Sequence, residues 1–197
     1  MTFKTTPCFV TATDGWEGIK AHPVMAWLNS YTKYFKDLTH DPKVVASLDP
    51  YTTWHTENFT YVCPNGKTYT GQEAWEKRVE MYEKMFSEHE AVPTYGHVNP
   101  VFADDGETIK GYSMMGEAWL FANYMKPGDE KIVEGKNGKM WDIKVPNCLH
   151  MEIVIDEKGP DGFKMDKVQV FCNALPIMLG AYKRGVIQRE DILGPAA

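Results

Sequence analysis

Residues 54–75 read WHTENFTYVCPNGKTYTGQEAW and change backbone pattern three times. The segment NFTYV is rich in aromatic and β-branched residues, which favours a strand. The dipeptide Asn65-Gly66 is typical of a tight hairpin turn, and KTYTG supplies a second short strand after it. From Gln72 onward the apolar residues recur at helical spacing. The sequence therefore predicts a hairpin that leads directly into a helix.

Helical patterns lie on both sides of this hairpin. In the segment before it, the apolar residues recur on one helical face. Pro42 follows Asp41 in the arrangement of a helix start, with the acidic residue at the N-cap and proline at the first helical position. After the hairpin, Trp75, Val79 and Tyr82 lie along one stripe. Three helices are expected in the N-terminal half, over residues 22–40, 42–48 and 72–89.

The second half of the chain has strand patterns that are separated by turn residues. Strands joined by hairpin-type turns pair antiparallel, because parallel pairs need crossovers of a dozen or more residues. The polar, glycine-rich segment 126–139 is expected to be an exposed insertion, and 177–194 a helical tail. The whole chain, 1–197, is predicted to be one α+β domain. Its expected strands cover residues 95–103, 108–124, 147–155 and 163–174.

Composition excludes several classes of function. The formal charge of −6 and the absence of long Lys/Arg runs argue against nucleic acid as a partner. No segment has the apolar length of a membrane span or of a secretory signal, so we expect no membrane association and a cytoplasmic location. The four cysteines form no C-x-x-C pair, which argues against a disulfide scaffold and a structural zinc site. Motifs for nucleotides, dinucleotides, serine hydrolases and zincins are missing, so no cofactor is expected.

The segment 54–75, together with the order of the elements, resembles the nuclear transport factor 2-like superfamily, which includes scytalone dehydratase and SnoaL-like polyketide cyclases. The resemblance implies a cone-shaped, curved, mostly antiparallel sheet wrapped around the three N-terminal-half helices. It also implies a homodimer and a hydrophobic small-molecule substrate. The expected activity is a cofactor-free isomerase, cyclase or dehydratase acting on a polyketide- or terpenoid-type molecule. The alternative is a non-catalytic ligand-binding or dimerisation module of the same fold.

The resemblance to scytalone dehydratase also implies catalytic positions. Tyr31 lies on the expected first helix, ten residues before Asp41, which is the interval found in that enzyme. Tyr61, in the first strand, is similar to its second substrate-facing tyrosine. Both hydroxyls would stabilise an enolate, while His97 would remove a proton next to a carbonyl. A second catalytic histidine would fall near Trp119, which transfers no proton.

Strand parity leaves a second histidine candidate open. His150 shares one face of its strand with polar neighbours, and that face points either into the cone or away from it, depending on the register. His150 is therefore an alternative proton acceptor. His22, His40 and His89 are expected at helix ends, where they are solvated or compensate the helix dipole at a C-terminus. The expected substrate-binding residues are Trp27, Tyr34, Trp54, Cys63, Glu117, Trp119 and Asn173.

The related limonene-type epoxide hydrolases need an arginine and paired aspartates in the pocket. Arginine occurs in this sequence only at positions 78, 184 and 189, all on helices or in the tail, which disfavours that activity. Cys63 stands where ketosteroid isomerase has its base, before the proline of the turn, so the steroid-isomerase mechanism is also disfavoured.

Overall fold

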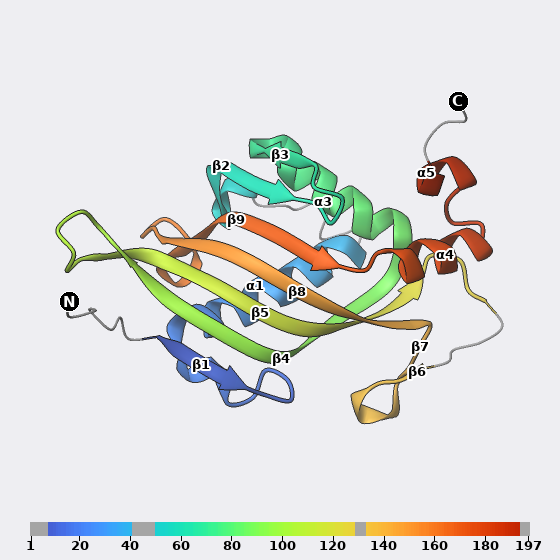
Figure 1. Cartoon of the computed structure of the whole chain (residues 1–197), viewed down its shortest axis with the longest axis horizontal. Helices are drawn as coiled ribbons and strands as arrows, with labels where there is room; N and C mark the ends of the chain where they lie inside the picture. Colours follow the sequence, from blue (N-terminus) through green and yellow to red (C-terminus); the bar gives the residue numbers. More distant parts are fainter. Residues whose placement is uncertain (1–7, 41–49, 129–132, 194–197) are drawn as a thin grey trace, which may run out of the picture.

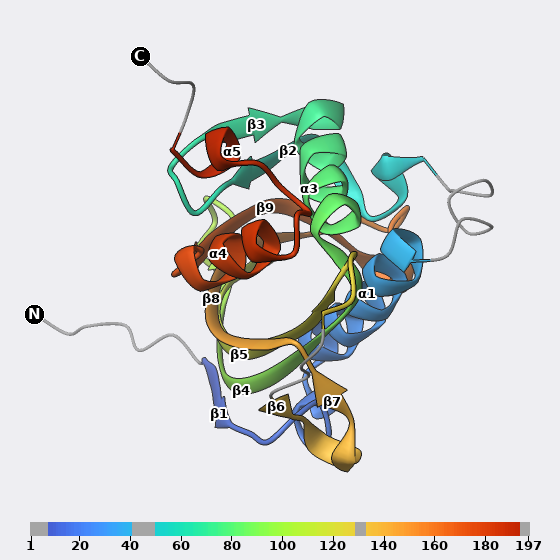
Figure 2. The same cartoon turned by 90° about the vertical axis from the view of Figure 1, so that its right-hand side faces the viewer.

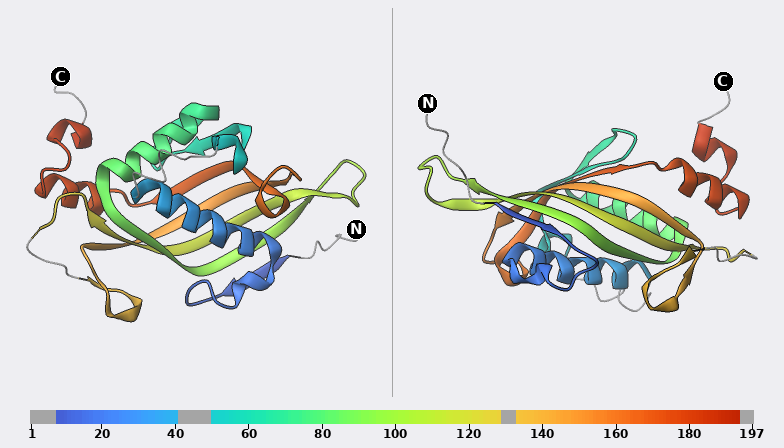
Figure 3. Two further views of the ribbon diagram at one scale, coloured as in Figure 1. Left: turned by 180° about the vertical axis from the view of Figure 1, so that it is seen from behind. Right: turned by 60° about the horizontal axis from the view of Figure 1, so that its bottom comes forward.

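The computed structural model describes residues 8–40, 50–128 and 133–193. Two helices lie against one face of a curved seven-stranded sheet (Figures 1 and 2). They are α1, Pro23–His40, and α3, Gly71–Met85. The view from behind shows both helices in front of the same face (Figure 3). The α+β class and the curved, mostly antiparallel sheet are confirmed, whereas the helix expected over 42–48 falls outside the described residues.

The strand order across the sheet is β1-β4-β5-β8-β9-β2-β3. Neighbouring strands are antiparallel except β2 and β9, which are parallel. The meander of four consecutive strands expected from the sequence corresponds to β4-β5-β8-β9. The strand bounds are β1 Phe9–Ala12, β2 His55–Val62, β3 Thr68–Thr70, β4 Phe86–Phe102, β5 Ile109–Tyr124, β8 Ile143–Ile155 and β9 Phe163–Cys172.

The hairpin of β2 and β3 turns at Asn65-Gly66. Gly66 has a φ of 83°, in the left-handed region that glycine adopts without strain. The Asn65 side-chain oxygen accepts a hydrogen bond from the Lys67 amide at 3.0 Å, which closes the turn. Tyr61 pairs with Tyr69 across the hairpin. The turn predicted from the sequence is therefore present, with the residues that favour it.

Helix α3 ends earlier than its sequence pattern predicts. The helix was expected to continue to His89, but it stops at Met85, and β4 begins at Phe86. Residues 86–93 pair with the far end of β5, where Phe86 lies opposite Tyr124 and His89 opposite Ala122. This pairing joins residues that are 25 to 38 positions apart, so no local pattern could show it. The result is a strand of 17 residues that starts nine residues before the expected one.

Smaller elements complete the fold. β1 pairs with the edge of β4 and was not predicted. Within the segment 126–139, the structure places part of a two-stranded ribbon, in which β6, Val133–Glu134, pairs with β7, Met140–Trp141. The tail forms α4, Leu175–Lys183, and α5, Arg189–Leu193, beyond the end of β9 (Figure 1). Helix α4 buries Ile177 and Ala181 against the Met85, Phe86 and Tyr124 cluster.

The main core lies between α1 and the concave face of the sheet. Val24, Met25 and Trp27 of α1 are fully buried there, against Val98 of β4 and Met114 of β5. No helix in the described part of the chain is long and apolar enough to cross a membrane.

Candidate functional site

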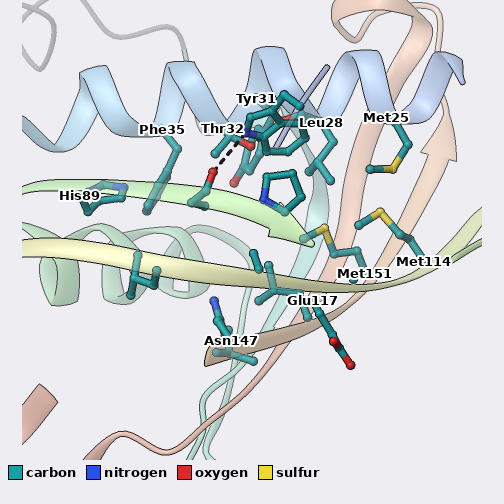
Figure 4. A pocket seen from close by; sticks show the side chains of 18 of the residues that line it. Met25, Leu28, Tyr31, Thr32, Phe35, His89, Met114, Glu117, Asn147 and Met151 are labelled. Atoms are coloured by element: carbon teal, nitrogen blue, oxygen red, sulfur yellow. Dashed lines mark hydrogen bonds between the residues drawn. The ribbon is translucent and has the colours of Figure 1, made fainter. Parts of the chain in front are cut away.

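An interior cavity of about 80 Å³ lies between α1, α3 and the concave face of the sheet (Figure 4). Leu28 and Phe35 of α1 form one wall, and Met114, Leu120 and Met151 of the sheet form the other. A second cavity of about 340 Å³ continues toward α4. The two cavities share the lining residues Tyr82, Leu120, Asn147 and Val170. Together they offer a mostly apolar interior, which is the usual character of a small-molecule site.

A chain of hydrogen bonds connects three elements on the helical side of this cavity. His55 Nδ1 lies 2.8 Å from the Tyr51 carbonyl oxygen, so Nδ1 carries the proton and donates it. Nε2 is then an acceptor, and the Tyr31 hydroxyl donates to it at 2.9 Å. The Tyr31 oxygen in turn accepts a hydrogen bond from the Arg78 guanidinium. The chain therefore joins β2, α1 and α3 through side chains that are all buried.

Burial keeps the tyrosine and the histidine of this chain uncharged. It lowers the pKa of His55 to about 3, and the nearby Arg78 charge acts in the same direction. Burial raises the pKa of Tyr31, although Arg78 opposes that shift. At neutral pH, the imidazole and the phenol are both neutral. Because the Tyr31 proton is held by His55, its hydroxyl is not available to donate to a substrate.

Other polar side chains also line the cavity. The Tyr61 hydroxyl has a long hydrogen bond of 3.7 Å to Met81 Sδ and a side-chain hydrogen bond with Cys63. Burial raises the pKa values of Tyr61 and Tyr82, so both remain neutral donors. His89 lies on β4 with its ring 4.7 Å from the Tyr82 ring, measured between centroids. The hydroxyls and the imidazole thus meet in one apolar space.

Asn147 projects from β8 into the cavity on the side opposite α1 (Figure 4). It is 9% exposed, and its side-chain oxygen has no hydrogen-bond partner among the described residues. A buried amide without a partner is costly, so such a group in a cavity favours a bound ligand that satisfies it.

His97 and His150 lie on the opposite, convex face of the sheet. Gly96 and Val98 face α1, where Gly96 approaches Met25, so His97 between them points away. His150 lies between the cavity-lining Leu149 and Met151 and contacts Ser113 Oγ through Nε2 at 3.1 Å. The sequence left two registers open for this strand, and the structure has the one in which His150 points away from the cavity. Neither histidine lines the cavity.

Three other expected binding residues lie toward the convex face or its rim. Glu117 is exposed, and its carboxylate points away from Tyr31 (Figure 4). Trp119 and Asn173 line a separate groove that also includes Phe171. The Trp119 ring contacts the Lys144 ammonium at 4.2 Å from its centroid.

The remaining expected residues are close to the cavity. Tyr31 and Tyr61 line it, and Cys63 lines the second cavity. Trp27, Tyr34 and Trp54 form an aromatic cluster behind Tyr31, with the Trp27 ring stacked on Tyr31 at 5.6 Å between centroids. This cluster holds Tyr31 in place and does not itself reach the cavity lining.

Sequence reasoning missed His55, Arg78, His89 and Asn147. Two of them had a usable signal: Arg78 lies three residues after Trp75 and four before Tyr82, on the buried stripe of α3. Asn147 shares strand parity with Leu149 and Met151. His89 had no usable signal, because the sequence around it has a helical pattern. Among the described residues, no three His, Cys, Asp or Glu side chains cluster as metal ligands would.

The structure has the curved, mostly antiparallel sheet with helices on one face that the sequence resemblance implied. A putative calcium/calmodulin-dependent protein kinase II association domain from Xanthomonas campestris matches with a TM-score of 0.50 and 15% identity, over 83% of this chain and 96% of that one. A putative SnoaL-like polyketide cyclase from Jannaschia sp. CCS1 gives 0.46 and 15%, over 83% and 94%. An NTF-2 like protein of unknown function from Pseudomonas aeruginosa gives 0.48 and 10%, over 77% and 99%. No family model and no curated protein matches the sequence. The match to the association domain, at 15% identity, establishes a common fold and nothing finer.

Proposed function

We propose that this protein is a cofactor-independent lyase or isomerase that moves a proton next to a carbonyl group of an apolar, oxygenated small molecule. Polyketide- and terpenoid-type compounds have this character. The observation that carries the proposal is the interior cavity, where Tyr61, Tyr82, His89 and Asn147 bring polar groups to apolar walls. A scaffold without a ligand would gain stability by filling this space and would not keep an unpartnered amide in it.

His89 is the proposed proton acceptor, because an imidazole titrates near neutral pH and this is the only histidine among the described residues that line the cavity. It would remove the proton from the carbon next to the carbonyl. Tyr61, whose described hydroxyl partners are the sulfur groups of Met81 and Cys63, would donate to the resulting enolate oxygen. Asn147 would position a second oxygen of the substrate.

The fate of the proton decides the type of reaction. In an isomerisation, His89 returns it to a different carbon of the enolate. In a dehydration, a carbon–oxygen bond breaks, and the proton leaves with the hydroxyl group as water. In a cyclisation, the enolate carbon attacks a second carbonyl carbon, and the proton goes to the new alkoxide. All three need the same base and the same oxyanion donor.

The experiment is hydrogen–deuterium exchange of substrate candidates in D₂O, followed by NMR. A panel of aryl and alkyl ketones is offered to the wild-type protein. His89→Gln should lower the exchange rate by about 10² to 10⁴, and Tyr61→Phe by about tenfold or more. Tyr182→Phe, on the exposed face of α4, is the matched control. Unchanged exchange in His89→Gln would refute the role of His89, and no exchange of any ketone would refute the proposed function.

A homodimer through the convex face is part of the proposal. Exposed apolar side chains gather there: Val10 is 52%, Met115 40% and Phe171 47% exposed. Val10 and Met115 both pair with His97 in neighbouring strands, so they share one row. Exposed apolar side chains on a sheet face favour an interface, and here they share the face with the polar side chains of His97, His150 and Glu117.

A further inference from the structure

Arg78 is a buried cation at the wall of the interior cavity. Its side chain is 8% exposed, and its guanidinium carbon lies 4.5 Å from the Phe35 ring centroid and 5.4 Å from that of Tyr31. Its polar contacts are the Tyr31 oxygen and, at 4.0 Å, Met165 Sδ, both made through one terminal nitrogen. A guanidinium has five N–H donors on three nitrogens. Most of its hydrogen-bonding capacity is therefore unused by the described residues.

No carboxylate of the described chain compensates this charge. The ion pairs of the described residues involve other cations, and Arg78 is in none of them. The buried titratable groups that interact with its charge, Tyr31, Tyr61, Tyr82 and His55, are neutral, because burial raises the pKa of each phenol and lowers that of the imidazole. An arginine keeps its charge in any protein environment. A buried, uncompensated charge of this kind is strongly destabilising unless a partner pairs with it.

The described residues of the cavity walls offer no internal partner either. Glu117 is the one carboxylate among the described lining residues, and it is exposed and points away from Tyr31 (Figure 4). The rest of the lining is apolar or neutral and polar, apart from His89. The cavity is therefore an apolar space with a fixed positive charge in one wall. A ligand that neutralises Arg78 would gain both the ion pair and the burial of its apolar part.

We infer that the molecule bound in this cavity is an apolar monocarboxylic acid whose carboxylate pairs with Arg78. A planar carboxylate matches the two-pronged geometry of a guanidinium, and a single negative charge neutralises the single positive one. A phosphate would carry further negative charge into an apolar space. The hydrogen bond to Tyr31, which His55 fixes from the other side, sets the position of the guanidinium. This inference adds a substrate class to the proposed function. It rests on the proposed function only because it places the substrate in the same cavity.

The test compares an acid with its neutral amide by isothermal titration calorimetry. The probes are 4-oxo-4-phenylbutanoate and 4-oxo-4-phenylbutanamide, which differ in charge and hardly at all in shape. Wild-type protein should bind the acid at least about tenfold more tightly, a difference of about 1.4 kcal/mol. Arg78→Met should abolish this preference. Arg189→Met, at an exposed arginine of α5, should keep it.

Several outcomes would overturn the inference. These are equal binding of acid and amide, a preference that persists in Arg78→Met, tighter binding of phenyl phosphate than of the acid, or no binding of the acid at about 1 mM. If Arg78→Met does not fold, Arg78→Gln is judged by the same criterion, and the wild-type comparison needs no variant.

The same probes separate this inference from the proposed function. Both carry exchangeable protons next to a ketone. A preference for the acid without proton exchange in D₂O would refute proton-transfer activity on this probe and leave the carboxylate site standing. Exchange without any preference for the acid would support the activity and refute the carboxylate site.

Discussion

The Tyr31 hydroxyl lies 2.9 Å from Nε2 of His55, and this single hydrogen bond connects the first helix to the first strand of the hairpin. Because Nδ1 of His55 donates to the Tyr51 carbonyl, the direction of the bond is fixed, and Tyr31 is the donor. Tyr31, which was expected to activate a substrate, instead accepts a hydrogen bond from Arg78 and donates one to His55.

Tyr31→Phe should destabilise the protein and weaken the carboxylate site. The variant leaves a buried acceptor on His55 and removes one anchor of Arg78, so the free energy of unfolding should fall by about 1–3 kcal/mol. The preference for acid over amide should fall with it. Urea unfolding and calorimetry measure the two effects. Tyr182→Phe, exposed on α4, should change neither, and a Tyr31→Phe protein with wild-type stability would contradict the hydrogen-bond chain.

The buried imidazole makes stability depend on pH. The pKa of His55 is about 3 in the folded protein, against an ordinary value of 6.5, so the unfolded chain binds more protons between these values. The free energy of unfolding should therefore fall as pH drops from 6.5 toward 3, by up to about 1.4 kcal/mol per pH unit from this group.

His55→Gln removes the titrating group, so its pH slope over this window should be smaller than that of the wild type. The comparison of slopes matters because burial also lowers the pKa of His22, which adds a slope of the same sign in both proteins. Chemical unfolding of both proteins at several pH values measures the two slopes. Identical slopes would show that His55 does not titrate on unfolding.

The buried ion pair between Arg184 and Asp142 should hold the tail against the end of the sheet. Its N–O distance is 3.0 Å, the Asp142 side chain is 3% exposed, and the same oxygen accepts a bond from the Tyr124 amide at 2.9 Å. Arg184→Met leaves a buried carboxylate unpaired, which should cost about 3–5 kcal/mol. Amide exchange in α4 should rise. The double variant with Asp142→Asn should recover part of the loss, and a simple sum of two losses would contradict the pairing.

The convex face should mediate dimerisation. Wild-type protein is expected to be a dimer by light scattering at micromolar concentration, and Phe171→Glu should shift it to the monomer by replacing an exposed apolar side chain of this face with a charged one. Leu179→Glu, at a similarly exposed position on α4, is the control and should remain dimeric. A monomeric wild type, or equal effects of both variants, would rule out this interface.

The sequence alone was sufficient for the elements whose signals are local. The Asn65-Gly66 turn, the apolar face of α1 and the alternation in the strand around Cys148 and His150 each depend on neighbouring residues, so their patterns predict their structures. Together with the order of elements, they determined the fold class. Tyr31 and Tyr61 could be assigned to the interior for the same reason, since each lies on the apolar face of its element.

Only the tertiary structure decided which polar groups meet. The face of His150 depends on the register between β8 and its neighbours, and a shift of one residue reverses it. His89 reaches the cavity because residues 86–93 pair with the distant end of β5, which overrides their helical pattern. Arg78 and Tyr31 are 47 positions apart, and their contact requires α1 and α3 to pack on the same face of the sheet. Such long-range pairings have no local trace, because their energy comes from packing between segments that are remote in the chain.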